Sequence, residues 1–224
     1  MELLELNLKA IIERKGGDFS QFLAENNVKK VNDLKLSDIE LFCAREDIQL
    51  DNLLLYNHNI DRSRLKNIKF IILDVDGVMT DGGMNYTQKG DEIKNYNTKD
   101  GRGILEAGKL GVQFGIISSG HTMELIKRRA DVLKIDNFYV GKEPKLKVLD
   151  MWCERMDIKL SEMAIIGDDL NDLEVMKHVG FSAAPADAVP VIKKQADLIL
   201  QKRGGEGCVR EFIDYYLLDK PLTK

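Results

Sequence analysis

The chain has 224 residues, which suits one main domain with a smaller appendage. Its 33 Lys and Arg residues against 37 Asp and Glu residues give a formal net charge of −4, so neither nucleic acid nor an anionic membrane is an expected partner. No apolar run reaches the roughly 18 to 20 residues of a membrane-spanning helix, no signal peptide is recognisable, and Cys43, Cys153 and Cys208 form no C-x-x-C pair. We therefore expect a cytoplasmic protein with reduced cysteines.

Residues 1–66 are expected to form a small helical N-terminal segment. Apolar residues recur at helical spacing from Leu3 to Ile12, and Gly16 and Gly17 end that run. A second short helix is expected from Asp18, and a third from Ser37 as its N-cap, with Glu40 three residues on. Residues 36–55 faintly resemble the last helices of helix-turn-helix domains. However, residues 1–66 hold 10 Lys and Arg against 12 Asp and Glu, so the basic face of a DNA reader is missing and a packing or oligomerisation role is favoured.

Residues 67–224 are expected to form an α/β domain built on a doubly wound parallel sheet. Short apolar runs predict buried parallel strands, and helical stretches separate most of them. The predicted strands are 70–73, 112–117, 138–140, 164–166 and 198–200, and the predicted helices are 123–133, 146–156 and 170–179. Residues 83–87 and 92–96 flank a turn-rich segment and predict a β-hairpin flap.

Two acidic clusters follow predicted strands, where the ligand crevice of an open α/β sheet lies. Asp74 and Asp76 come after the first strand, and Asp168, Asp169 and Asp172 come after the fourth. Carboxylates gathered at one strand edge repel one another, and a hard divalent cation such as Mg²⁺ relieves that repulsion. Solvated turn carboxylates or a capped helix start are the plainer interpretations of these clusters.

Two further polar positions follow strands. Ser118 and Ser119 follow the second strand, and Lys145 opens a predicted helix. A serine at a strand end can donate to an anionic oxygen, but Ser-Ser-Gly is also common in turns. Taken alone, neither the serines nor the lysine indicates more than a solvated surface.

Together and in this order, the four clusters resemble the active-site motifs of haloacid dehalogenase-like (HAD) phosphatases, over about residues 68–218. Residues 97–103, 184–188 and 204–211 are similar to a narrower, capless branch whose members dephosphorylate eight-carbon and nine-carbon keto-sugar acids. The resemblance implies a Rossmann-like HAD core and a Mg²⁺-dependent phosphomonoesterase. Its implied substrate is 3-deoxy-D-manno-octulosonate 8-phosphate, with a nine-carbon acid 9-phosphate as the alternative.

The resemblance also implies roles for individual residues. Asp74 would be the nucleophile and Asp76 the proton donor and acceptor. Asp74, Asp76 (through its backbone carbonyl) and Asp168 would hold Mg²⁺, while Lys145 and a serine would hold the phosphoryl group. Spacing leaves Ser118 and Ser119 open for that role, and we favour Ser118. Asp169, Asn171 and Asp172 would orient these groups.

Substrate contacts are implied for a further set of residues: Asn97, Thr98, Lys99, Asp100, Gly101, Ser119, Arg129 and Arg210. Two positions often filled by Arg in relatives are Leu105 and His121 here. A carboxylate of the sugar acid would then be bound by Lys99, Arg129 or a neighbouring chain's tail.

The gaps from Asp76 to Ser118 and from Ser118 to Lys145 are too short for a separate cap domain. The resemblance implies a homotetramer instead, with residues 84–93 in the oligomer core and residues 204–210 reaching towards an adjacent pocket. A non-catalytic HAD-fold oligomerisation domain and a phospho-accepting signalling receiver are the alternatives. Asp74, Asp76, Lys145 and Asp168 are all present, which disfavours the first, and the second has no use for Asp76 or for the acidic cluster from Asp168 to Asp172.

Overall fold

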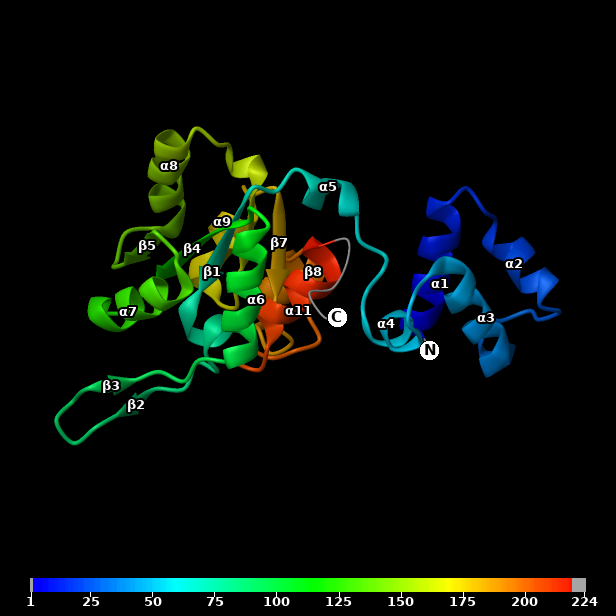
Figure 1. Cartoon of the computed structure of the whole chain (residues 1–224), viewed down its shortest axis with the longest axis horizontal. Helices are drawn as coiled ribbons and strands as arrows, with labels where there is room; N and C mark the ends of the chain where they lie inside the picture. Colours follow the sequence, from blue (N-terminus) through cyan, green and yellow to red (C-terminus); the bar gives the residue numbers. More distant parts are fainter. Residues whose placement is uncertain (1, 219–224) are drawn as a thin grey trace. The chain divides into compact units, whose positions relative to one another are not determined.

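The computed structural model describes residues 2–218, which fall into two compact units that divide between Asp61 and Arg62 (Figure 1). The division comes slightly earlier than the expected one after residue 66. Helix α5 (Arg62–Lys66) is part of the second unit, because Arg62 Nη2 donates to the carbonyl of Tyr215 at 2.7 Å and Arg64 pairs with Asp197 at 2.5 Å.

The first unit is helical, as expected. It contains α1 (Glu2–Arg14), α2 (Phe19–Glu25), α3 (Leu36–Glu46) and α4 (Leu50–Leu55). Asp18 caps α2, since its carboxylate accepts from the N–H of Gln21 at 2.9 Å. The expected Ser37 cap is wrong: α3 begins at Leu36, and the Asp38 carboxylate accepts from the N–H of Lys35 at 2.9 Å.

The helices of this unit enclose a core of their own. Its buried side chains are Leu4, Leu8, Ile11, Ile12, Phe22, Val31, Ile39, Phe42, Cys43 and Leu53. Asn7 is also fully buried: it donates to the carbonyls of Leu53 and Tyr56 and accepts from the N–H of His58 at 2.7 Å. This satisfied amide ties the chain after α4 to α1.

The second unit is the expected doubly wound α/β domain. Its parallel sheet has the order β5-β4-β1-β6-β7-β8. The strands are β1 (Phe70–Asp74), β4 (Gln113–Ser118), β5 (Asn137–Val140), β6 (Met163–Ile166), β7 (Phe181–Ala184) and β8 (Leu198–Ile199). Strand β7 was missed in the sequence, because Phe-Ser-Ala-Ala has only one large apolar residue; buried Ser182 is satisfied by Asp197 at 3.0 Å.

Helices cover both faces of this sheet. One layer contains α6 (Thr98–Lys109), α7 (Met123–Leu133) and α11 (Cys208–Phe212). The other contains α8 (Lys145–Met156), α9 (Leu173–Met176) and α10 (Pro190–Gln195). Helix α9 is shorter than the predicted helix 170–179, because residues 170–172 form a separate 3₁₀ turn. Phe70, Ile72 and Ile165 pack with Trp152 and Ile192 in the core of the second layer.

The predicted hairpin is present as β2 (Asn85–Tyr86) and β3 (Glu92–Ile93), and Figure 1 shows it extending away from the sheet. Its turn is closed by the N–H of Thr87 donating to the carbonyl of Asp91 at 2.9 Å. Met84, Tyr86 and Ile93 are more than half exposed on this hairpin. They are apolar side chains that the described unit does not cover.

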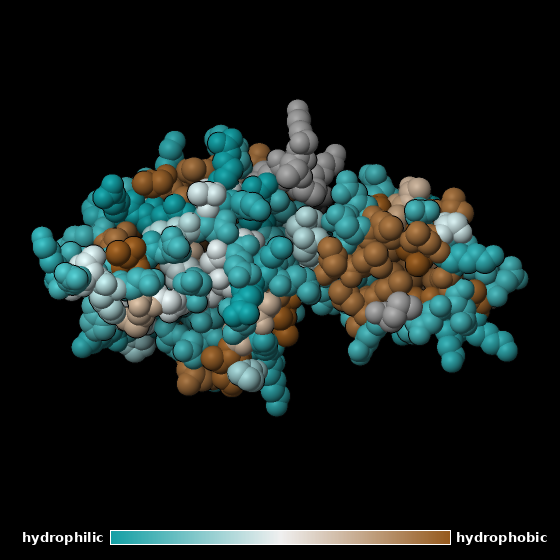
Figure 2. Space-filling view, turned by 90° about the horizontal axis from the view of Figure 1, so that it is seen from below, coloured by the Kyte–Doolittle hydropathy of each residue, from teal (hydrophilic) through white to brown (hydrophobic). Residues whose placement is uncertain are grey.

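Among residues 2–218, no helix is long and apolar enough to cross a membrane. Figure 2 shows a broad hydrophobic area on the helical unit, whose exposed large apolar side chains are Leu6, Leu36, Leu41, Leu54 and Leu55.

Candidate active site

The sheet brings the predicted catalytic residues to one edge. Asp74 is the last residue of β1, Ser118 is the last residue of the neighbouring β4, and Asp168 follows β6 on the other side of β1. Asp74 is in register with Ile117, so Ser118 lies one residue further along the same edge. Parallel strands therefore gather three separate motifs at their carboxyl ends, as an open α/β sheet does.

Lys145 is at the centre of a buried ion cluster. Its ammonium donates to Asp74 Oδ1 at 2.6 Å and to Asp172 Oδ1 at 2.7 Å. The exposed fractions of Lys145, Asp74 and Asp172 are only 4%, 4% and 0%. Asp172 also accepts from the N–H of Asp168 at 3.1 Å, so it fixes both the lysine and the strand-end turn. Charges this deeply buried persist only when they are paired in this way.

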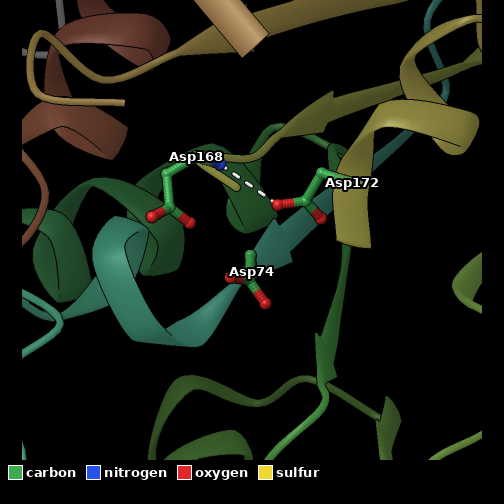
Figure 3. A group of neighbouring side chains, drawn as sticks. All are labelled: Asp74, Asp168 and Asp172. Carbon is green, nitrogen blue, oxygen red and sulfur yellow. Dashed lines mark hydrogen bonds between the residues drawn. The ribbon is translucent and has the colours of Figure 1, made fainter. Parts of the chain in front are cut away.

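The three carboxylates of Asp74, Asp168 and Asp172 surround one small volume (Figure 3), with one ligand atom from each within 4.8 Å of the others. Burial, and then the charges of Asp74 and Asp172, raise the pKa of Asp168 to about 8. Burial also raises the pKa of Asp74 to about 6, against the opposing effect of Lys145. Asp168 Oδ1 is buried and accepts no hydrogen bond. These oxygens fit a hard divalent cation such as Mg²⁺.

Gly77 brings the loop after β1 against Asp168. Its φ of +95° lies in the left-handed region, and a Cβ at this position would be 2.0 Å from Asp168 Oδ2. Only glycine allows this approach. The Asp-x-Asp-Gly pattern contained this residue, but the need for it is visible only in three dimensions.

Asp76 lies at the mouth of the site and contacts a residue that the sequence did not single out. Its Oδ1 accepts from Lys94 Nζ at 2.5 Å, and Lys94 also pairs with Glu92 at 2.8 Å. Burial alone would lower the pKa of Lys94, but the bonds to Asp76 and Glu92 outweigh it and raise that pKa. Lys94 and Glu92 both lie at the end of the hairpin, and because they are far from Asp76 in the sequence this contact could not be predicted from it.

The two serines occupy different environments. Ser118 is buried, and its Oγ accepts from the N–H of Gly120 at 3.0 Å. Ser119 is exposed, and its Oγ accepts from Asn171 Nδ2 at 3.1 Å. Asp169 caps the 3₁₀ turn, since its Oδ1 accepts from the N–H of Leu170 at 2.7 Å. Asp169 and Asn171 therefore shape the turn after β6 at its exposed side.

A cavity of about 390 Å³ adjoins this edge, and it contains three of the predicted substrate contacts, Asn97, Thr98 and Lys99. Its remaining lining residues are Asp81, Asn95, Tyr96, Gly205 and Glu206. Asn97 caps α6 and donates to the carbonyl of Gly205 at 3.0 Å. Lys99 is the cavity's one cationic side chain among the residues described.

Four other predicted substrate contacts, Asp100, Gly101, Arg129 and Arg210, are not among the residues that line this cavity. Arg129 lies over the ring of Tyr96 with its Cζ 4.7 Å from the ring centre, and its Nη2 lies against Gly101. Asp100 is 2% exposed, accepts from the N–H of Arg210 at 2.7 Å, and has its pKa raised to about 6 by burial. The Arg210 side chain pairs with Asp214 at 2.7 Å, away from the cavity. The structure thus gives these residues internal partners.

Residues 204–210 pack against the loop after β1 of their own chain, and their reach towards an adjacent pocket stays a prediction. The N–H of Gly205 donates to the carbonyl of Val78 at 2.9 Å. A Cβ at Gly204 would be 1.9 Å from the carbonyl oxygen of Gly77, so the two backbones touch. Because these glycines carry no side chain, the segment closes against the loop that holds Asp76.

Comparisons with known proteins agree with this geometry. A family model described as haloacid dehalogenase-like hydrolase matches residues 141–212. The 3-deoxy-D-manno-octulosonate 8-phosphate phosphatase KdsC of Escherichia coli K12 is 38% identical over 156 residues, which are 70% of this chain and 82% of that protein.

Two solved structures are also similar. The 3-deoxy-D-manno-octulosonate 8-phosphate phosphatase from Yersinia pestis has a TM-score of 0.67 at 36% identity, with 70% of this chain and 84% of that chain covered. The same enzyme from Moraxella catarrhalis, solved with a magnesium ion, a phosphate ion and a KDO molecule, has a TM-score of 0.67 at 33% identity, with 70% and 89% covered. The chain therefore belongs to the haloacid dehalogenase-like hydrolases, in the family of the KdsC phosphatases.

Proposed function

We propose that this chain is a Mg²⁺-dependent phosphomonoesterase that converts 3-deoxy-D-manno-octulosonate 8-phosphate into the free sugar acid and phosphate. The observation that carries the proposal is the buried contact of Lys145 with Asp74, 2.6 Å long, beside the crowded carboxylate of Asp168. A solved relative of this family from Moraxella catarrhalis holds magnesium, phosphate and KDO. The three free cysteines suit the reducing cytoplasm, where we expect the enzyme to act.

The catalytic residues act in two steps. In the first, an Asp74 oxygen attacks phosphorus while the bond from phosphorus to the sugar oxygen breaks, and Asp76 gives its proton to that oxygen. In the second, water attacks the aspartyl-phosphate at phosphorus, Asp76 takes a proton from the water, and Asp74 is released. Two of the three Lys145 donors are used by Asp74 and Asp172, so one remains for a phosphoryl oxygen. Buried Ser118 is the second candidate for holding the phosphoryl group.

Asp74, Asp168 and the backbone carbonyl of Asp76 are the groups proposed to hold Mg²⁺. When bound, the ion offsets carboxylate–phosphate repulsion and stabilises charge in phosphoryl transfer. The unpartnered Asp168 Oδ1 and its raised pKa support this assignment. Gly77 keeps that carboxylate close to the loop after β1.

The sugar acid is proposed to extend from the phosphate site into the cavity that Lys99 lines. Its carboxylate needs a cationic partner, and Lys99 is exposed there, whereas Arg129 is packed against Tyr96. Leu105 and His121 stand at positions where the resemblance to relatives often implies Arg, and this departure weakens the eight-carbon assignment. Nine-carbon acids are therefore tested as well.

We also propose a homotetramer, assembled through the hairpin. Met84, Tyr86 and Ile93 leave an apolar surface on a projecting element, which a neighbouring copy would cover. The helical unit, with its own core and its hydrophobic area in Figure 2, is proposed as a packing or oligomerisation module.

A substrate panel tests the proposal. Phosphate release would be measured with Mg²⁺ on the eight-carbon keto-acid 8-phosphate, nine-carbon keto-acid 9-phosphates and common hexose phosphates. Preference for the eight-carbon substrate is expected. Preference for a nine-carbon substrate would reassign the substrate, and no release from any phosphate by a folded oligomer would leave the non-catalytic function as the better description.

A further inference from the structure

Lys94 is the one cation described in contact with the Asp76 side chain. Its ammonium lies 2.5 Å from Asp76 Oδ1, and only 5% of the Lys94 side chain is exposed. The Asp76 side chain itself is 41% exposed, so a buried lysine holds a carboxylate that substrate can reach. Asp76 Oδ2 lies 3.8 Å from where a side chain at Gly120 would begin.

Lys94 is in turn held by residues on two other segments. Glu92 Oε1 lies 2.8 Å from its ammonium, and Glu92 Oε2 accepts from Thr122 Oγ1 at 2.9 Å. Glu92 belongs to β3 and Thr122 to the loop before α7. A continuous chain of contacts therefore connects Asp76 to the hairpin and to the loop that follows Ser118 and Ser119.

We infer that Lys94 is a positioning residue for proton transfer at Asp76, and that Glu92 holds Lys94 in place. This inference rests on the proposed phosphomonoesterase activity. By occupying Oδ1, Lys94 leaves Oδ2 as the oxygen that carries the proton to the leaving sugar oxygen and later takes one from water. A carboxyl group that carries its proton on Oδ2 still accepts from Lys94 through Oδ1, so the contact is compatible with both steps.

Burial argues against a direct substrate contact for Lys94. The 5% exposed lysine already has two carboxylate partners, whereas Lys99 is exposed in the adjoining cavity. The contact with Lys94 keeps the Asp76 carboxyl group in a geometry suited to proton transfer. Because it matters most when the leaving oxygen takes its proton, it should raise kcat. The effect should therefore depend on the leaving group.

The test compares Lys94→Met with Lys89→Met, the same change at an exposed turn of the same hairpin. Each protein is assayed on the keto-sugar acid phosphate, whose alkoxide leaving group needs a proton, and on p-nitrophenyl phosphate, whose leaving group does not. We expect Lys94→Met to lower kcat on the sugar phosphate about 10- to 100-fold, with KM within about threefold, as for lost acid–base assistance. On p-nitrophenyl phosphate it should retain most of the wild-type kcat, and Lys89→Met should resemble wild type on both.

Three outcomes would overturn the inference: equal losses on both substrates by a folded Lys94→Met protein, a rise in KM with kcat unchanged, or no change at all. If Lys94→Met does not fold, Glu92→Gln decides, because it keeps the side-chain shape and should produce the same selective loss at smaller size. An equal loss or none in Glu92→Gln would also overturn it. If wild type hydrolyses p-nitrophenyl phosphate and some alkyl phosphates but no keto-sugar acid phosphate, the proposed substrate is wrong, and the same comparison is made with the alkyl phosphate it does accept.

Discussion

The ammonium of Lys145 lies 2.6 Å from Asp74 Oδ1, and both side chains are almost completely removed from water. The lysine opens α8 and the aspartate ends β1, so 71 residues of chain separate the two partners. Burying such a pair is costly unless both charges are satisfied. The pair therefore supports the catalytic role proposed for Asp74.

Replacing Lys145 by Met should both inactivate and destabilise the protein. Asp74 and Asp172 would lose their shared cation, and removing one partner of a buried ion pair costs roughly 3 to 5 kcal/mol. The free energy of unfolding, measured with urea in the presence of chelator, checks this. Lys147→Met is the matched control, since the Lys147 side chain lies on the same helix and is 64% exposed. Equal stabilities of the two variants would contradict the prediction.

Asp74→Asn should abolish turnover without loss of thermal stability in chelator. The amide cannot form the aspartyl-phosphate, so phosphate release should fall by at least about 10³-fold. At the same time, the change removes one of three crowded carboxylates, while Lys145 keeps Asp172. Asp136→Asn, an exposed position away from the site, provides the control for the assay and for the melting temperature. Residual turnover near the wild-type rate would exclude Asp74 as nucleophile.

Stability without metal should fall as the pH rises. The pKa values of Asp74 and Asp168 are raised to about 6 and about 8, above the value near 4 of an unfolded carboxyl group. The folded protein therefore binds more protons than the unfolded chain, and their stabilising contribution is complete below about pH 4 and lost towards about pH 8.

Added Mg²⁺ should remove much of this slope, since the ion replaces the protons between the carboxylates. Melting temperatures between pH 5 and pH 8, with Mg²⁺ and with chelator, measure the effect. Parallel curves with and without Mg²⁺ would show that these carboxylates do not bind the ion.

Gly77→Ala should weaken Mg²⁺ binding by displacing the Asp168 carboxylate. A methyl group there would collide with the Asp168 carboxylate, 2.0 Å from Oδ2, and the φ of +95° would strain any side chain. We expect the Mg²⁺ concentration at half-maximal activity to rise at least about tenfold, by analogy with losses on disturbing the residues that orient metal ligands. Gly108→Ala is the control, because a methyl group at Gly108 meets nothing within 4 Å. An unchanged Mg²⁺ requirement in Gly77→Ala would show that Asp168 is not a ligand of the ion.

Removing residues 1–61 should leave the catalytic requirement intact. Every residue of the candidate active site belongs to the second unit, and the first unit has a separate core. The truncated protein should keep its Mg²⁺ requirement and a kcat within about threefold of the full chain, as expected for independent domains, while its oligomer size or solubility changes. Loss of phosphate release by a folded truncated protein would assign the helical unit a part in the reaction.

Most of the α/β unit could be predicted because its signals are local. The apolar runs of β1, β4, β5 and β6 were recognisable, and α7 begins and ends at the predicted residues. Strand β7 lacked that signal, since its side chains are small and its single hydroxyl finds a partner only in Asp197. The 3₁₀ turn at residues 170–172 replaced part of a predicted helix because Asp169 and Asp172 bond backbone N–H groups there.

The residues of the candidate active site likewise divide into those with a local signal in the sequence and those placed only by long-range contacts. Asp74 and Asp168 follow predicted strands, while the role of Lys145 was implied only by the resemblance to HAD phosphatases, and the structure brings all three together. Lys94 was not predicted, because its contact with Asp76 depends on how the hairpin folds back. Arg129 and Arg210 stay predicted substrate contacts, and in the structure their side chains contact Tyr96 and Asp214. The Arg210–Asp214 pair has the i,i+4 spacing that a sequence can reveal, whereas the contact of Arg129 with Tyr96 depends on the fold.

Phosphate release from 3-deoxy-D-manno-octulosonate 8-phosphate, measured with Mg²⁺ and again with chelator, tests the central claim most directly. We expect steady release with Mg²⁺, its loss in chelator and its return when Mg²⁺ is restored. Release that is unaffected by chelator, or no release by the folded protein with Mg²⁺ present, would contradict the function proposed for Asp74, Asp168 and Lys145.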